Sequence, residues 1–243
     1  TSYNLPYGME PPQNIEPKST LISIIFAIAF AVLLMFIFMK YHAELILRLW
    51  VFAVVALAIG VTFNSVIMNI PYSAMIAFVA AVPLAFLKVF KRNILVHNFT
   101  ELIIYPGVAA IFVPLLKPVW AAVVLFVIIS LYDMYAVWHA GFMQKMAKYQ
   151  IQKLRFFAGF FVPYIGKKER ISMEKAKLNN KKKKIKVNVA ILGGGDVVFP
   201  IILAGVVLRN LGILPALLIS LGATLALAAL FMFSQKGKFY PAM

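Results

Sequence analysis

The chain has 243 residues, of which 63% are hydrophobic, above the roughly 45–50% of soluble globular domains. It contains no cysteine, which excludes disulfide bonds, cysteine-zinc sites and thiol catalysis. The formal net charge is +16, but the basic residues lie in loops beside apolar segments, a distribution typical of membrane orientation and binding to anionic lipid headgroups rather than to nucleic acid.

Apolar blocks of membrane-spanning length follow one another along the chain, so the predicted fold class is all-α, a polytopic transmembrane helical bundle. The polar, proline-rich residues 1–19 precede them as a solvated tail or loop. Seven spans are predicted, over residues 20–39, 45–68, 72–87, 94–113, 118–143, 187–207 and 214–233. The chain reads as one membrane domain with four parts, namely 1–19, the helical part 20–143, the basic loop 144–186 and the helical part 187–243.

The basic residues are distributed unequally across the predicted membrane. Lys18, Lys117 and Arg209 fall on one side, and the other 21 of the 24 lysines and arginines fall on the opposite side. Because the side richer in lysine and arginine is cytoplasmic, we expect an extracytoplasmic tail and a cytoplasmic loop over 144–186.

Two stretches of this loop carry patterns of their own. Residues 156–163 (FFAGFFVP) are apolar but too short to span, which indicates an interfacial segment. Further on, Ile185, Val187 and Val189 alternate with polar residues, as in a strand. Two interpretations stay open, and the start of the next helix is favoured over an edge strand that pairs with an extended peptide.

The only two aspartates of the chain, Asp133 and Asp196, lie in two of the predicted spans. An ionisable group at bilayer depth costs at least ~2.5–3.5 kcal/mol, which favours a functional role. Each lies about ten residues, or ~15 Å of helix, from the predicted cytoplasmic boundary. The two carboxylates are therefore expected at the same depth.

Two carboxylates that meet in a low-dielectric site cannot both ionise, so the pair holds one proton near neutral pH. The unprotonated carboxylate can then take a proton from water while the protonated one donates to a peptide carbonyl. Asp133 and Asp196 are the candidate catalytic residues. Gly193 and Gly195 lack side chains that would keep a substrate backbone or another helix away from them.

The remaining polar residues within the spans predict structure rather than chemistry. Glu101 is interpreted as a hydrogen-bonded structural group, with His97 and Asn98 as its nearest partners in sequence. The three histidines are far apart in sequence, so no metal site is predicted, and the proposed chemistry needs no cofactor.

Tyr132-Asp133 in one apolar segment and Gly193-Gly194-Gly195-Asp196 in a later one resemble the YD and GxGD motifs of the presenilin and signal peptide peptidase family of intramembrane aspartyl proteases. The two motifs occur in the family's order and flank a hydrophilic loop, as the family requires. The resemblance implies a nine-helix fold and hydrolysis of transmembrane segments or signal peptides. The short loops favour a microbial, archaeal member.

The family's third motif, Pro-Ala-Leu, has two counterparts here. Pro241, Ala242 and Met243 follow Asp196 after one full span, where the family places the motif, whereas Pro215-Ala216-Leu217 comes too early. The resemblance implies site-shaping roles for Pro241, Ala242 and Met243 beside Tyr132 and the three glycines. Since seven spans are predicted, it also implies a first helix before residue 1 and a ninth after residue 243.

Three alternatives are weighed against this hypothesis. A prepilin-peptidase-type protease shares the GxGD letters, but its cysteine-rich insert is absent from this sequence. A proton- or ion-coupled transporter or channel would also keep aspartates in the membrane, although no internal repeat supports it. The third is a non-catalytic chaperone. The expected partners are transmembrane peptides and lipids, and a homo-oligomer stays open.

Overall fold

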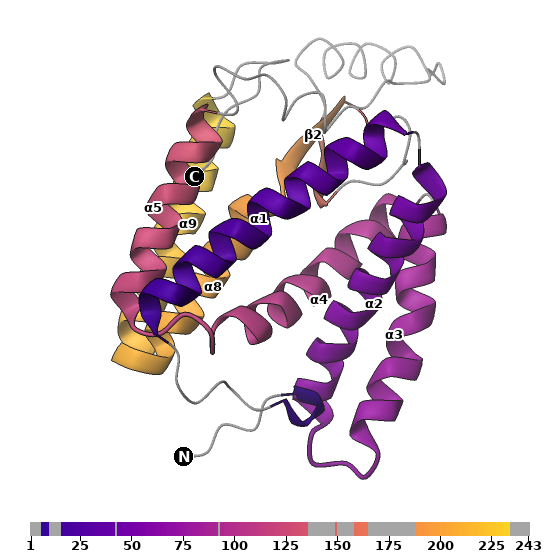
Figure 1. The fold of residues 1–243 in the computed structure, drawn as a ribbon, viewed down its shortest axis with the longest axis horizontal. Coiled ribbons are helices and arrows are strands. Elements are labelled where there is room, and N and C mark those ends of the chain that lie inside the picture. The colour runs from indigo at the N-terminus through magenta and orange to yellow at the C-terminus, as the bar shows by residue number, and fades with distance from the viewer. Residues whose placement is uncertain are drawn as a thin grey trace, which may run out of the picture.

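The computed structural model describes residues 6–9, 16–41, 43–91, 93–135, 149, 158–164 and 188–233. Its described part consists of seven α-helices, one short 3-10 helix and a β-hairpin (Figure 1). The all-α prediction is confirmed, and the hairpin is an addition to it. The helices are α1 (Pro17–Lys40), α2 (Glu44–Ile67), α3 (Ser73–Phe90), α4 (Ile94–Phe112), α5 (Val119–Tyr135), α8 (Gly195–Leu211) and α9 (Ile213–Phe233).

Five of these helices, α1, α2, α3, α4 and α9, are long and apolar enough to cross a membrane. Helix α5 is apolar as well, with 17 described residues. The predicted spans match these helices to within a few residues at most ends. The chain is thus an integral membrane protein with several passes.

Small residues allow the central helices to approach one another closely. Ala81 and Ala85 of α3 are fully buried against α2, in a core that also contains Ile59. A Cβ atom on Gly107 of α4 would collide with the Ala58 carbonyl of α2. Close backbone contact of this kind is how membrane helices gain packing energy without a hydrophobic driving force.

Local signals set the helix ends around the aspartates. The Asn93 side chain caps α4, where its Oδ1 accepts hydrogen bonds from the backbone of Leu95 (2.9 Å) and Val96 (3.4 Å). Gly212, with φ +94°, ends α8 and lets the chain turn directly into α9. In the bundle, the described end of α5 and the start of α8 both lie at the end that carries the hairpin (Figure 1).

The hairpin pairs β1 (Gly159–Tyr164) with β2 (Asn188–Gly193) in antiparallel register, Gly159 opposite Gly193. The favoured prediction of a helix from residue 187 was wrong, because the helix begins only at Gly195 and the alternative, a strand, is found over Asn188–Gly193. The segment 156–163 forms a strand from Gly159 onward, and its interfacial position stays a prediction. The β-branched and aromatic residues of both segments pair across the strands, and the glycines from 193 to 195 separate strand from helix.

Part of the predicted solvated tail packs on the bundle. The 3-10 helix η1 (Pro6–Gly8) lies against α2, where the Tyr7 backbone N–H donates to Asn64 Oδ1 at 2.7 Å. Asn64 is 2% exposed and its amide nitrogen also donates to Ser73 at 3.2 Å. This contact lies at the end of the bundle opposite β2 (Figure 1).

Candidate active site

Asp196 lies in the first turn of α8, immediately after the strand β2. The Gly193 backbone N–H hydrogen-bonds its carboxylate, which is half-buried. A Cβ atom on Gly193 would lie only 3.0 Å from Asp196 Oδ2, so a side chain at this position would push the carboxylate away. The first glycine of the motif is thus explained by a close approach to the acid it precedes.

Gly194 connects the strand to the helix and touches two further elements. Its backbone N–H donates to the Ala158 carbonyl at 3.0 Å, just before β1. A Cβ atom here would lie 3.1 Å from that oxygen and 3.1 Å from the hydroxyl oxygen of Tyr105 on α4. The loop that carries Asp196 is therefore fitted closely between β1 and α4.

Tyr105 is a residue of this site that sequence reasoning missed. It is 4% exposed, its ring packs edge-on against Phe160 of β1 at 5.5 Å, and its hydroxyl points toward Gly194. In the described part of the chain the Glu101 carboxylate is near enough to act on this hydroxyl as a weak hydrogen-bond partner, although without good hydrogen-bond geometry, and the charge of Asp196 also acts on it. The only signal in the sequence is its position four residues after Glu101 in an apolar helix.

Asp133 lies two residues before the described end of α5 and is half-buried. It follows Phe126 and Ile129 at helical spacing, so these three share one stripe of the helix. Phe126 and Ile129 pack against a core that includes Ile202 and Val206 of α8, and the Phe126 ring meets Phe199 of α8 edge-on at 5.6 Å. The stripe of α5 that carries Asp133 is therefore the one that contacts α8.

Asp196 precedes Phe199 by three residues and so lies on the face of α8 that meets α5. The charge of Asp133 acts through space on the Asp196 carboxylate. Within the residues that the structure describes, no hydrogen bond joins the two carboxylates directly. The two acids thus lie on the contacting faces of antiparallel helices, at the same end of the bundle.

The expected depth of Asp196 needs correction. Helix was predicted for about ten residues on its cytoplasmic side, but six of these residues form β2, and the helix begins one residue before the aspartate. The carboxylate therefore stands at a helix N-terminus, where the free backbone N–H groups favour negative charge. For Asp133, the residues from 136 to 148 lie outside the described part.

The other predicted site residues are only partly described. Tyr132 is 42% exposed, Gly195 begins α8, and Val189 lies in β2 with 43% of its surface exposed. Five more lie outside the described residues, namely Ile185, Val187, Pro241, Ala242 and Met243. The competing motif, Pro215-Ala216-Leu217, begins at the third residue of α9. Among the described residues no group of three or more His, Cys, Asp or Glu could hold a metal ion.

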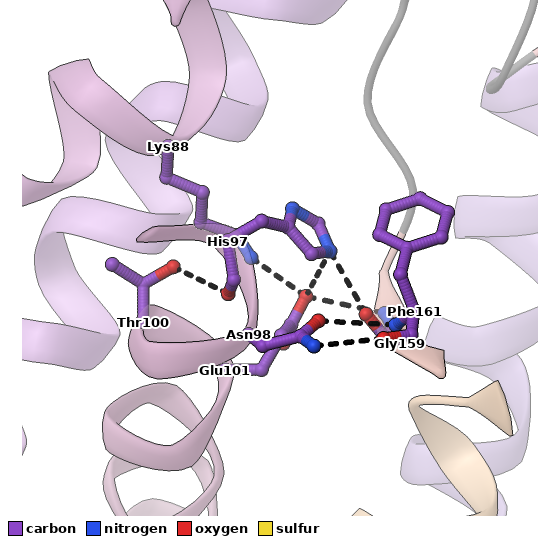
Figure 2. A network of polar contacts seen from close by, with 7 residues as sticks. All are labelled: Lys88, His97, Asn98, Thr100, Glu101, Gly159 and Phe161. Atoms are coloured by element: carbon purple, nitrogen blue, oxygen red, sulfur yellow. Dashed lines mark hydrogen bonds and ion pairs between the residues drawn. The ribbon is translucent and has the colours of Figure 1, made fainter. Parts of the chain in front are cut away.

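The prediction for Glu101 as a hydrogen-bonded structural group is confirmed. Its Oε1 lies 2.6 Å from Lys88 Nζ of α3 and accepts the Gly159 backbone N–H at 3.1 Å (Figure 2). His97 Nε2 is 3.6 Å from the same oxygen. Sequence reasoning missed Lys88, because it directly follows the predicted span 72–87, whereas the structure buries it to 5% exposure.

These features define a class, a polytopic helical membrane protein with two aspartates on contacting helices beside a small β-hairpin. The model of the family described as "Signal-peptide peptidase, presenilin aspartyl protease" matches residues 5–242, and the chain belongs to this family. The family consists of intramembrane aspartyl proteases that act on transmembrane substrates. Searches of curated proteins and of solved structures gave no significant match.

Proposed function

We propose that the protein is an intramembrane endopeptidase of the GxGD type in which Asp133 and Asp196 together activate water. The observation that carries this proposal is their placement at the same end of two helices that pack on each other, α5 and α8, whose Phe126 and Phe199 rings meet at the stripes that carry the aspartates. The family membership supports the same chemistry.

The reaction needs only the two carboxylates, water and the substrate. The ionised carboxylate takes a proton from water as the oxygen attacks the carbonyl carbon, and the protonated one donates to the carbonyl oxygen. Collapse of the tetrahedral intermediate breaks the C–N bond: the carboxyl that took the proton from water delivers it to the leaving amine, and the other carboxylate takes a proton back from a hydroxyl of the intermediate. One water is consumed, one acid and one amine are formed, and the pair returns to its starting protonation.

A peptide bond inside a helix is shielded by its own hydrogen bonds, so the substrate must unwind locally before it can react. We propose that the unwound part pairs with β2, with Val189 and the preceding Val187 and Ile185 as its neighbours. In the described chain, β2 ends directly at the glycines that hold Asp196. An extended peptide along this strand would therefore lead toward the acid.

The rest of the family's site is proposed by the same reasoning. Pro241, Ala242 and Met243 are the proposed third motif, and the Tyr132 hydroxyl is proposed to meet substrate or a neighbouring helix. The charge distribution favours a cytoplasmic loop over residues 144–186, with its lysines on anionic lipid headgroups. Water would then enter the site from the cytoplasmic side.

A cleavage assay with the full chain in lipid vesicles tests this proposal. The parent, Asp133→Ala and Asp196→Ala are incubated with a membrane-spanning peptide, and the products are identified by mass spectrometry. We expect fragments from the parent and none from either variant. Glu16→Ala, which removes an exposed carboxylate at the start of α1, is the control and should cleave like the parent.

The same vesicles separate the protease from a transporter. A transporter that uses the two aspartates would carry ions or protons across the vesicle membrane, would lose this flux on either substitution, and would release no fragments in any version. That result would overturn the proposed function.

A further inference from the structure

The strand β1 has two edges, and one of them is occupied by side chains of the helix α4. The Gly159 N–H donates to Glu101 Oε1 at 3.1 Å, and the Gly159 carbonyl contacts His97 Nε2 at 2.8 Å. Two positions on, the Phe161 N–H donates to Asn98 Oδ1 at 3.0 Å, and Asn98 Nδ2 donates to the Phe161 carbonyl at 2.8 Å. Figure 2 shows these four contacts.

The four contacts reproduce what a neighbouring strand would supply. In an antiparallel pair, the N–H and C=O of one residue point to the same side, and successive residues alternate. Because Gly159 and Phe161 point toward α4, Phe160 and Val162 must bond to β2. The next residue on the α4 side is Pro163, which has no N–H to offer. This edge of β1 is thus closed to a further strand.

The closing side chains are themselves held in place. Glu101 is 2% exposed and is paired with Lys88 of α3 at 2.6 Å. The His97 ring packs against the ring of Phe161, with centroids 4.8 Å apart and the ring planes tilted by 48°. Thr100 is fully buried and donates to the His97 carbonyl at 2.8 Å. The edge of β1 is therefore fixed to α4 and, through Lys88, to α3.

The same alternation shows which groups of β2 are left. Leu192 and Ala190 stand opposite Phe160 and Val162 and bond to β1, so Val189, Ile191 and Gly193 direct their N–H and C=O groups to the outer edge. The Gly193 N–H engages the Asp196 carboxylate. Within the described part of the chain, no hydrogen bond reaches the outer edge at Val189 or Ile191.

We propose that His97, Asn98 and Glu101, with Lys88, are positioning residues of the protease, which close the β1 edge of the hairpin and so direct an unwound substrate to the β2 edge that leads to Asp196. This inference rests on the proposed function. An unpaired strand edge accepts any extended chain, so closing one edge selects the side of the sheet on which a substrate pairs. It also fixes the distance of the paired peptide from the catalytic acid.

The variant Asn98→Ala tests the proposal, because it removes both contacts to Phe161. We expect KM for a membrane-spanning peptide to rise on the order of tenfold, the equivalent of two hydrogen bonds, while kcat changes by less than about threefold. Cleavage should also spread to positions next to the parental one. Both effects follow from a loosened sheet with an intact acid pair.

Asn64→Ala is the matched control for a general loss of stability. Asn64 is buried, its amide also makes two hydrogen bonds, and it lies at the opposite end of the bundle. At equal thermal stability it should leave KM and the cleavage position as in the parent. If Asn98→Ala behaves like Asn64→Ala in both readouts, the positioning role is refuted.

A second variant and a second readout keep the test decisive. His97→Phe retains a ring against Phe161 but loses the contact to the Gly159 carbonyl, so we expect a smaller rise in KM than for Asn98→Ala. This variant tests the proposal if Asn98→Ala does not fold. Amide hydrogen exchange at Phe161 should be faster in Asn98→Ala than in Asn64→Ala. If the parent releases no fragments, the proposed function fails. Unchanged amide exchange at Phe161 in Asn98→Ala would refute the closure of the β1 edge, whatever the cleavage assay shows.

Discussion

Replacing Lys88 by methionine is expected to destabilise the protein strongly, because Glu101 then stays buried without its cation. The two charged atoms are 2.6 Å apart, and the side chains expose only 1% and 2% of their surface. Breaking a buried ion pair by removing one partner costs about 3–5 kcal/mol, whereas removing both charges is often nearly neutral. The double variant Lys88→Met with Glu101→Gln keeps an acceptor for the Gly159 N–H and should recover to within about 1 kcal/mol of the parent.

The assay is thermal unfolding in detergent micelles, with the four proteins of a double-mutant cycle side by side. For a chain of this size, a loss of 3–5 kcal/mol corresponds to a fall in melting temperature on the order of 10 °C. Lys91→Met is the control, since Lys91 is exposed three residues further on, and it should stay within about 0.5 kcal/mol of the parent. A double variant as unstable as Lys88→Met alone would refute the reasoning.

Three further substitutions separate the roles of close contacts. Gly194→Ala places a Cβ atom 3.1 Å from the Ala158 carbonyl oxygen and 3.1 Å from the Tyr105 hydroxyl oxygen. The resulting displacement near Asp196 should lower kcat on the order of tenfold. Gly222→Ala is the control, because its Cβ atom would lie in open space and should leave kcat unchanged. Gly107→Ala collides with the backbone of α2 and should cost about 1–3 kcal/mol in thermal unfolding. Tyr105→Phe removes a buried hydroxyl without a well-formed hydrogen bond, so the melting temperature should stay equal or rise, and a loss above about 2 kcal/mol would reveal a strong partner.

The helices could be predicted from the sequence because membrane-spanning segments are long, apolar and separated by charged turns. Helix α4 was predicted over 94–113 and is found over Ile94–Phe112. The predicted start of the helix that carries Asp196 was wrong. The strand β2 directly precedes α8, is similarly apolar, and is not separated from it by a charged residue. Hydrophobicity alone does not separate a buried strand from a buried helix.

The hairpin and its contacts could not be predicted for a different reason. Gly159 pairs with Gly193, and a basic loop separates them in the sequence, so no local pattern connects the two. Lys88 lies at a predicted boundary, where a lysine is normally solvated, and only its pairing with Glu101 on the next helix reveals its burial. Residues whose roles depend on a neighbouring helix leave little trace in a single sequence.

The central claim is that Asp133 and Asp196 act as one unit, and the rates of peptide cleavage by Asp133→Asn, Asp196→Asn and the double variant test it most directly. Residues that act together in one step give losses that do not add, so each single variant should lose as much activity as the double variant. Two partial losses that combine multiplicatively in the double variant would contradict a shared step, and cleavage at the parental rate by either single variant would remove that aspartate from the mechanism.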